Sequence, residues 1–259
     1  MDFQGQTAFV SGGGRGIGRA ICGTLADHGA DVVVADLDEG ERSETVGMVE
    51  SNGGTAHSVY LDLRDAGCVE SAVAEAKEIA GSIEILVNNA GIAGPTAPCE
   101  AVTIEEWDHT FDVNLRGMFL LTKEILPGMK EAEYGRIVNI SSITGKRPLY
   151  HRTPYAASKL GVIGFTRTLA EEVGTFDINA NAICPGSVEG PRITDVFERQ
   201  AEARGISYEA IREEAEQEAP RRELVQPEDI GDAVAFLCSG AAERITGEDL
   251  NVTAGKVMY

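Results

Sequence analysis

The stretch TAFVSGGGRGIG, residues 7–18, decides the fold. Its first four residues form the short apolar run typical of a buried strand, and the glycines after them permit a tight turn into a helix that we expect to open at Arg19. Glycines in such a turn let the backbone approach a pyrophosphate, whose charge the free amide groups of a helix N-terminus can bind. The stretch therefore predicts a strand–turn–helix unit that binds a dinucleotide.

Short apolar runs of the same kind recur along the chain, separated by longer segments of helical period. This alternation predicts βαβ units, and right-handed crossovers between them give a doubly wound, Rossmann-like parallel sheet of the α/β class. Pro154 and Pro227, each after a start signal at Thr153 or Gln226, mark the first turns of two helices. No linker or repeat divides the chain, so we expect one domain, 1–259. The expected strands are 7–10, 32–36, 55–61, 83–89, 135–141, 178–184 and 248–252.

Residues 191–222 interrupt this alternation of strands and helices. They are polar, dense in charge and helical in propensity, and they follow the carboxyl end of the sixth expected strand. Ligands bind at that edge of an open α/β sheet. We therefore expect a mobile helical lid over the site, and the alternative is a solvated helical excursion with no role in binding.

The chain is strongly acidic. It has 42 Asp and Glu residues against 22 Lys and Arg residues, which gives a formal net charge of -20. A field of this sign repels phosphates, so we expect neither nucleic acid nor an anionic membrane surface as a partner. The charge fits a salt-adapted protein, and it equally fits an ordinary acidic enzyme whose glutamates lie on solvated helix faces.

Other classes of protein are disfavoured by composition. No apolar run reaches the roughly 18 residues that a membrane-spanning helix needs. The N-terminus shows neither a basic leader nor the apolar segment of a secretory signal, so we expect a cytoplasmic protein. The five cysteines and four histidines are scattered without a CxxC pair, which predicts no disulfide framework and no metal site.

A carboxylate closes the second expected strand. VVVAD, residues 32–36, ends in Asp36, and Leu37 follows it. A carboxylate at this point can accept hydrogen bonds from a ribose 2′-hydroxyl and repels a 2′-phosphate, while Leu37 offers such a phosphate no positive charge. The pattern predicts NAD(H) rather than NADP(H) as the cofactor.

Tyr155 and Lys159 are four residues apart, so they share one face of the helix expected to begin near Pro154. A free phenol titrates near about 10, too high for an efficient base at neutral pH. A neighbouring ammonium group stabilises the phenolate and lowers that pKa. Taken alone, the spacing fits an exposed tyrosine beside a solvated lysine better than a catalytic pair.

Other motifs along the chain favour a catalytic pair over an exposed tyrosine beside a solvated lysine. SGGGRGIG at 11–18, NNAG at 88–91, Asn114, Ser142 and YAASK at 155–159 together resemble the short-chain dehydrogenase/reductase family. The resemblance extends from residue 5 to about 255. It implies a hydride-transferring enzyme in which a nicotinamide cofactor carries the hydride and the protein supplies orientation and proton transfer.

The resemblance assigns four residues to the chemistry. Tyr155 would be the general acid/base, and Lys159 would lower its pKa and bind the nicotinamide ribose. Ser142 would hydrogen-bond to the substrate oxygen. Asn114 would hold a water molecule that links Lys159 to solvent.

The resemblance also implies a cofactor-binding set and a homotetramer or homodimer. Asp62 would contact the adenine ring, and Pro185 would lie beside the nicotinamide carboxamide. Ser11 stands where the family usually has threonine, and Gly190 replaces a threonine that usually helps to hold the carboxamide. The predicted cofactor residues are Gly12, Arg15, Gly16, Ile17, Gly18, Asp36, Leu37, Asp62, Leu63, Asn89, Ala90, Gly91, Tyr155, Lys159, Pro185, Gly186 and Val188.

The segment between Ser142 and Tyr155 is rich in cations, and no Asp or Glu occurs between Glu133 and Glu171. If both ends of the segment touch the reacting oxygen, the residues between them pass close to the substrate. Arginine forks suit carboxylates, so an anionic substrate is one interpretation, and a window buried in a subunit interface is the other. The residues proposed for the anion are Arg147, His151, Arg152 and Arg192.

The leading functional hypothesis is an NAD-dependent enzyme that interconverts a secondary alcohol and its ketone. Its substrate would be a small molecule, a polyol, a sugar acid or another hydroxy acid. The alternative within the same chemistry is reduction of a 3-oxoacyl thioester. An alternative of another class is a non-catalytic NAD-binding sensor or scaffold, because fold alone does not determine function.

Overall fold

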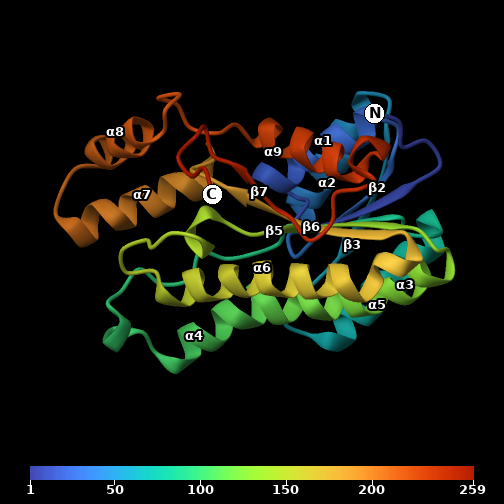
Figure 1. Cartoon of the computed structure of the whole chain (residues 1–259), viewed down its shortest axis with the longest axis horizontal. Coiled ribbons are helices and arrows are strands. Elements are labelled where there is room, and N and C mark those ends of the chain that lie inside the picture. Colours follow the sequence, from blue (N-terminus) through green and yellow to red (C-terminus); the bar gives the residue numbers. More distant parts are fainter.

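The computed structural model describes residues 1–259 and contains one sheet of seven strands, each parallel to its neighbours (Figure 1). The strands are β1 (Thr7–Ser11), β2 (Asp31–Asp36), β3 (Thr55–Tyr60), β4 (Ile85–Asn88), β5 (Gly135–Ile140), β6 (Ile178–Pro185) and β7 (Asp249–Val252). Their order across the sheet is β3-β2-β1-β4-β5-β6-β7. The winding reverses between β1 and β4, and ligands bind at such a reversal, beyond the carboxyl ends of the strands.

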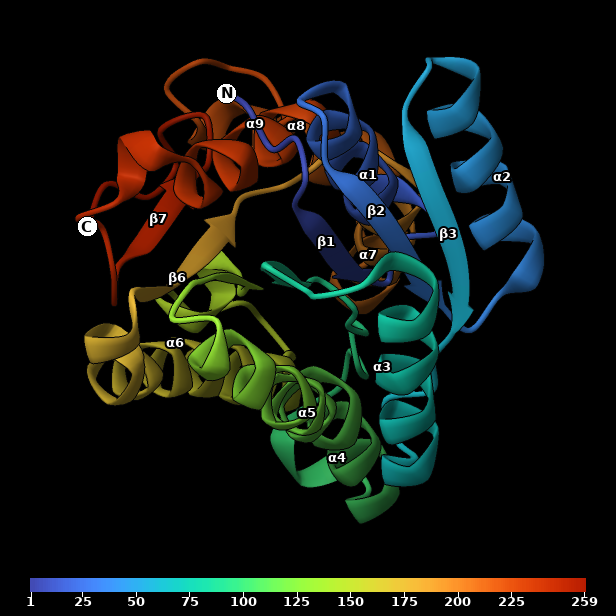
Figure 2. The same cartoon turned by 90° about the vertical axis from the view of Figure 1, so that its right-hand side faces the viewer.

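Helices cover both faces of the sheet (Figure 2). The helices α1, α2 and α9 pack on one face, and α3, α5 and α6 pack on the other. Their bounds, with those of the remaining helices, are α1 (Gly16–Asp27), α2 (Glu39–Ser51), α3 (Ala66–Ala80), α4 (Ile104–Phe111), α5 (Gly117–Glu131), α6 (Thr153–Val173), α7 (Pro191–Arg204), α8 (Tyr208–Glu218) and α9 (Pro227–Cys238). None of these helices is both long enough and apolar enough to cross a membrane.

Alternate residues of the central strands supply two separate cores, because successive side chains of a strand point to opposite faces. In β1, Phe9 joins the core under α3 and α5, whereas Val10 joins the core under α1 and α9. Every residue of β1, β4 and β5 is buried. Strands buried in this way and mainly apolar are typical of a parallel sheet covered on both faces.

The seven predicted strands are confirmed, with ends that shift by one or two residues. The predicted helix start at Arg19 is wrong, since α1 begins at Gly16 and its first turn contains the last glycines of the loop. Pro154 lies in the first turn of α6, as predicted, but Arg152 rather than Thr153 is the residue before the helix. Pro227 begins α9 directly after Gln226.

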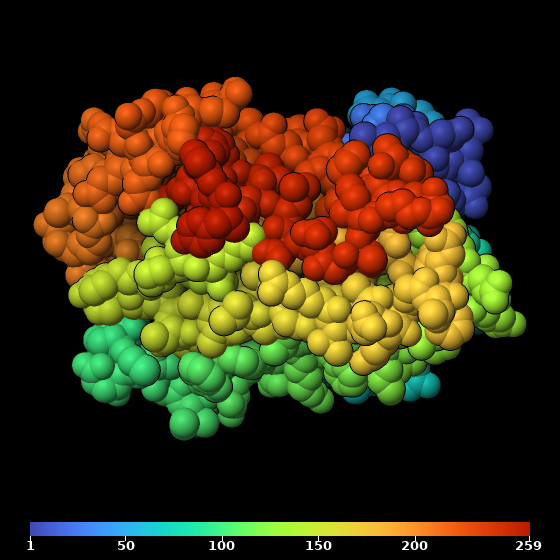
Figure 3. All heavy atoms as spheres, viewed as in Figure 1, coloured from blue at the N-terminus to red at the C-terminus, as the bar shows by residue number.

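The segment predicted to be helical, 191–222, forms α7 and α8, which extend from the sheet at the end of the molecule near the start of α6 (Figure 1). On the surface they form a continuous projection beside the segment before α6 (Figure 3). The pair encloses a small apolar cluster of its own, made by Phe197, Ala201, Ile211, Ala215 and Leu224. A helix pair with its own core can move as a unit, and the role of a lid stays a prediction.

Candidate active site

Gly12 and Gly18 bring the loop after β1 into close backbone contact. Gly12 has a φ of +65°, a left-handed conformation that favours glycine, and a Cβ there would lie 2.8 Å from the Cα of Ala90. A Cβ on Gly18 would lie 1.9 Å from the carbonyl oxygen of Gly12. The loop is thus a backbone cradle at the N-terminus of α1, which fits a pyrophosphate. The other predicted residues of this turn are Arg15, Gly16 and Ile17.

The hydroxyl of Ser11 joins this loop to the end of β4. It accepts hydrogen bonds from the backbone amides of Asn89 and Ala90, both at 3.2 Å. In return, Nδ2 of Asn89 donates to the carbonyl oxygens of Ser11 and Gly12, at 3.1 and 2.9 Å. Serine therefore makes the link for which the family usually uses threonine. The predicted residues Asn89 and Ala90 lie directly against the glycine loop.

The carboxylate of Asp36 lies beside the glycine loop, at the end of β2. Its Oδ2 accepts a hydrogen bond from the amide of Gly14 at 3.1 Å, and its Oδ1 accepts one from the amide of Leu37 at 2.8 Å. Leu37 is exposed, and Arg42 is buried with its guanidinium donating to the Asp36 carbonyl oxygen at 2.6 Å. This edge thus presents a carboxylate next to the cradle, which fits a ribose hydroxyl group.

Asp62 and Leu63 follow β3, as predicted for residues near an adenine ring. The carboxylate of Asp62 is already engaged, since Nη2 of Arg64 donates to its Oδ2 at 2.6 Å. Hydrogen bonds from Arg64 lower the pKa of Asp62. Leu63 is buried and packs against Gly117. Their contact with an adenine ring stays a prediction.

Ser142, Tyr155 and Lys159 come together beyond the carboxyl end of β5. Ser142 is buried in the loop that follows this strand, and its Oγ accepts a hydrogen bond from the amide of Thr144 at 3.1 Å. Tyr155 and Lys159 lie one turn apart on α6, and Nζ of Lys159 is 5.9 Å from the centre of the Tyr155 ring. This ammonium group donates to the carbonyl oxygen of Ile140 at 2.8 Å.

The surroundings of Tyr155 favour its phenolate. Burial opposes ionisation, but the charges of Arg192, Lys159 and Arg152 and hydrogen bonding to Ser142 outweigh it, so the pKa of Tyr155 lies below its ordinary value. Burial lowers the pKa of Lys159 to about 8, although the nearby phenol raises it in part. A phenol with a lowered pKa beside a buried ammonium group can take a proton from an alcohol near neutral pH.

Asn114 is buried in a π-helical turn, Asp112–Arg116, between α4 and α5. Its Oδ1 accepts a hydrogen bond from the amide of Ile92 at 2.7 Å. A Cβ on Gly91 would lie 3.0 Å from that Oδ1 and 3.4 Å from Nζ of Lys159, so the amide and the ammonium group flank the same glycine. Turns of this kind are frequent at functional sites. The water molecule predicted between Asn114 and Lys159 stays a prediction.

β6 is the neighbour of β5 in the sheet, so the residues at its carboxyl end lie next to the loop that carries Ser142. Gly186 donates from its amide to the carbonyl oxygen of Val252 at 2.9 Å, and a Cβ on it would lie 3.0 Å from the Cα of Thr253. Val188 is buried and forms a parallel bridge with Val225. Pro185, Gly186 and Val188 are therefore held at the carboxyl edge of the sheet, where a nicotinamide ring is predicted.

Two cations of the segment between Ser142 and Tyr155, which contains no Asp or Glu, are paired with acids from distant parts of the chain. Lys146 forms an ion pair with Asp249 of β7, and Arg147 pairs with Glu218 of α8 at 3.3 Å. These two cations therefore have acids within the same chain, whereas Arg152 has none. A subunit interface at this segment stays the alternative. Glu218 also pairs with Lys256, at 2.7 Å, so two cations share its single charge, and a role of Arg147 at an anionic substrate stays a prediction.

The other predicted anion-binding residues divide into two groups. His151 stacks on Tyr150, with ring centres 3.6 Å apart, and shows no link to the reacting group. Arg152 and Arg192 lie with their guanidinium carbons 5.1 and 6.0 Å from the centre of the Tyr155 ring. The structure therefore gathers two of the four predicted residues around the phenol.

Sequence reasoning missed Arg199. Its positive charge lies close enough to Arg152 to lower the pKa of that group. It stands seven residues after Arg192 on α7, so both lie on one helix face. That spacing was the signal that would have identified it.

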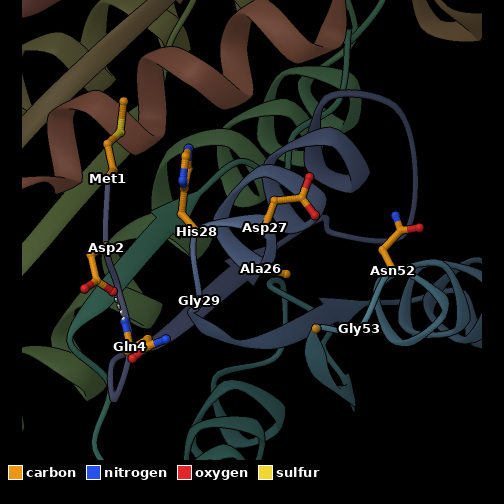
Figure 4. Close-up of a pocket in the computed structure, with 10 residues that line it drawn as sticks. Met1, Asp2, Gln4, Ala26, Asp27, His28, Gly29, Asn52 and Gly53 are labelled. Atoms are coloured by element: carbon orange, nitrogen blue, oxygen red, sulfur yellow. Dashed lines mark hydrogen bonds between the residues drawn. The ribbon is translucent and has the colours of Figure 1, made fainter.

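An open depression of about 380 Å³ lies at the other end of α1 (Figure 4). Its lining includes Asp27 and His28 at the end of that helix and Asn52 after α2, with Asp2 from the N-terminus. The glycine loop is at the opposite end of α1, so this depression is separate from the site described above. No group of three or more His, Cys, Asp or Glu residues in the chain is arranged to hold a metal ion.

Comparison with known proteins agrees with this geometry. The family model described as enoyl-(acyl carrier protein) reductase matches residues 12–256. A 3-oxoacyl-(acyl-carrier-protein) reductase of Aquifex aeolicus is 35% identical over 257 residues, which cover 98% of each chain. Oxidoreductase UcpA of Salmonella typhimurium is 35% identical over 258 residues, which cover 98% of this chain and 95% of that protein.

Solved structures give the same result. NAD⁺-bound xylitol dehydrogenase superposes with a TM-score of 0.95 at 27% identity, covering 98% of this chain and 100% of the other. A variant of actinorhodin polyketide ketoreductase with NADPH superposes with a TM-score of 0.95 at 35% identity, covering 98% of both chains. With the glycine cradle and the Ser142, Tyr155 and Lys159 cluster in place, these matches show that the chain is an oxidoreductase of the short-chain dehydrogenase/reductase family.

Proposed function

We propose that the protein uses NAD(H) to interconvert a secondary alcohol and its ketone, with Tyr155 as general acid/base. The observation that carries this proposal is the cluster around Tyr155, whose ring centre lies within 6.0 Å of the cationic groups of Arg152, Lys159 and Arg192. These cations lower the pKa of the phenol although burial opposes it. A base with such a pKa is effective nearer neutral pH than free tyrosine is. The cradle at Gly12 and Gly18 and the carboxylate of Asp36 support a bound dinucleotide.

A nicotinamide cofactor, when bound, supplies the hydride acceptor or donor. In the direction of oxidation, the Tyr155 phenolate takes the hydroxyl proton of the alcohol while the carbon-bound hydrogen leaves as hydride. In the direction of reduction, the phenol returns a proton to the ketone oxygen. Ser142 would orient that oxygen by a hydrogen bond. The positive charge of Lys159 helps to lower the pKa of Tyr155.

Asp36 supports NAD(H) over NADP(H). Its carboxylate accepts a hydrogen bond from the amide of Gly14 in the glycine loop, so a 2′-phosphate there would meet a like charge. Arg19, whose guanidinium group donates to the carbonyl oxygen of Gly14, is paired with Glu41 and Glu44. Similar proteins differ in this respect, since one solved structure holds NAD⁺ and another holds NADPH. The preference for NAD(H) therefore rests on the residues of this chain.

Two substrate classes fit the proposed reaction. The names of the curated relatives, several of which are ketoacyl reductases, support a 3-oxoacyl thioester better than a polyol or a sugar acid. The unpaired arginines near Tyr155 favour instead a small hydroxy acid or oxo acid. A non-catalytic sensor is disfavoured, because Asn114, Ser142, Tyr155 and Lys159 are all present and assembled.

We also propose that the protein works as a homodimer or homotetramer. Three large apolar side chains are exposed on α4, α5 and α6, namely Trp107, Phe119 and Leu160. We infer that copies of the chain meet through these helices, since an apolar patch exposed on a single chain marks an interaction surface. Sedimentation velocity on the purified protein tests this, and a monomer at micromolar concentration would contradict it.

The reaction is tested by following NADH and NADPH consumption with acetoacetyl-CoA, acetoacetate and pentane-2,4-dione. We expect turnover with NADH that falls by at least about a hundredfold in Tyr155→Phe, because general acid/base catalysis contributes about 10² to 10⁴. The Kd for NADH is measured for both proteins, so that a lost cofactor contact of Tyr155 is distinguished from lost catalysis. Equal turnover by Tyr155→Phe and wild type would refute the assignment.

A further inference from the structure

Positive charge accumulates around Tyr155 without a matching carboxylate. The guanidinium carbons of Arg152 and Arg192 lie 5.1 and 6.0 Å from the ring centre, and Nζ of Lys159 lies 5.9 Å from it. Neither arginine forms an ion pair, although the chain carries 42 acidic residues. In a protein of net charge -20, this is a local reversal of sign at the reacting group.

Arg152 is buried, with 2% of its surface exposed. Its Nη2 donates to the carbonyl oxygen of Ala93, its Nη1 lies 3.5 Å from Oγ1 of Thr96, and its Nε has no hydrogen-bond partner. The pKa of Arg152 is lowered to about 10, chiefly by burial and in part by the charges of Arg192 and Arg199, while Tyr155 opposes them. A buried guanidinium group without a carboxylate is costly, so an anion arriving from outside the chain relieves that cost.

The helix that carries Arg192 is held against the segment before α6. Gln200 of α7 is buried, and its Nε2 donates to the carbonyl oxygen of Tyr150 at 3.0 Å. Arg192 and Arg199 lie seven residues apart on one face of α7. Asp195 lies on the same face, yet it forms an ion pair with neither arginine. The face of α7 near Tyr155 is therefore net positive.

We propose that Arg192, with Arg152 behind it, binds the carboxylate of the substrate whose reacting carbon faces Tyr155. This inference deepens the proposed function and rests on it. Both guanidinium carbons lie within 6.0 Å of the ring centre, so we infer a substrate whose carboxylate is close to the reacting carbon. The substrate class is then a 2- or 3-hydroxy acid, or the matching oxo acid. Arginine suits this group because its fork binds both carboxylate oxygens.

The test compares each acid with its uncharged amide of the same shape. Wild type, Arg192→Met and Arg192→Lys are assayed with NADH on acetoacetate against acetoacetamide, and on pyruvate against pyruvamide. The control is Arg244→Met, because Arg244 is 86% exposed and follows α9, near the amino ends of the strands. Calorimetry with acetoacetate or pyruvate on the NAD⁺-loaded protein measures binding without turnover.

We expect wild type to prefer the acid, and Arg192→Met to lower the ratio of kcat/KM for acid over amide by about tenfold or more. The ratio cancels any effect of Arg192 on the pKa of Tyr155, since both substrates depend on the same phenol. Arg192→Lys should keep part of the preference, and Arg244→Met all of it. NADH affinity should be equal in all four proteins.

The possible failures are distinct. An acid-to-amide ratio that Arg192→Met leaves unchanged, or a wild type that binds neither acid, overturns the carboxylate site while the proposed function stands if any ketone is reduced. A parallel loss of NADH affinity in Arg192→Met also overturns it, because Arg192 would then serve a cofactor phosphate. Binding of either acid that depends on Arg192, without turnover of any ketone, supports the site and refutes the proposed reaction.

Discussion

Replacing Gly18 by alanine should weaken cofactor binding strongly while the fold persists. The added Cβ would lie 1.9 Å from the carbonyl oxygen of Gly12 and 2.7 Å from Nδ2 of Asn89. Carbon–oxygen contacts are about 3.3 Å, so the loop must move by more than about 1 Å. A displacement of about 1 Å can cost roughly a hundredfold at a positioned site, so we expect the Kd for NADH to rise by about a hundredfold, or about 2.8 kcal/mol.

Fluorescence titration with NADH measures this change, and thermal unfolding reports the cost to stability. Overpacking costs about 1–3 kcal/mol, which a domain of ordinary stability survives. The matched control is Gly47→Ala in α2, because Gly47 is exposed and a Cβ there meets no atom within 4 Å. It should keep the wild-type Kd and gain up to about 1 kcal/mol of stability. A Gly18→Ala protein that binds NADH within threefold of wild type would refute the reasoning.

Three further predictions concern charge. Asp36→Asn should raise the NADPH-to-NADH ratio of kcat/KM by about tenfold or more, because it removes the like charge that a 2′-phosphate would meet, and an unchanged ratio would exclude Asp36 from cofactor selection. The pH profile of alcohol oxidation should rise to a plateau with a pKa below that of free tyrosine, since cations lower the pKa of Tyr155 although burial opposes them; Arg192→Met should move that pKa upward, and an unmoved profile would count against the assignment. Glu218→Gln should speed tryptic cleavage within 191–222 while changing the free energy of unfolding by less than about 1 kcal/mol, because its carboxylate is half exposed and joins two cations. Burial raises the pKa of Glu218 but its cationic partners lower it overall, so with pepsin, which is active in acid, the difference between variant and wild type should disappear as the pH falls through that pKa. Equal tryptic cleavage of the two proteins at neutral pH would contradict the prediction.

The features that sequence predicted well are local ones. The seven strands are short apolar runs, and their alternation with helical segments needs no knowledge of distant contacts. Tyr155 and Lys159 lie on one face of α6 because a helix brings residues four apart together. The start of α1 was misplaced because glycine usually lowers helix propensity, whereas here Gly18 lies in the first turn and allows the close backbone approach.

The chain by itself indicated the alternation of strands and helices, the glycine-rich turn after β1 and the tyrosine–lysine spacing, since each depends on residues close together in sequence. Tertiary structure alone decided which cations keep an uncompensated charge. Arg147 meets Glu218 of α8, whereas Arg152 and Arg192 converge on Tyr155 without a carboxylate partner. The difference arises because an ion pair depends on packing between elements far apart in the chain, and residue spacing along the sequence carries no record of that packing.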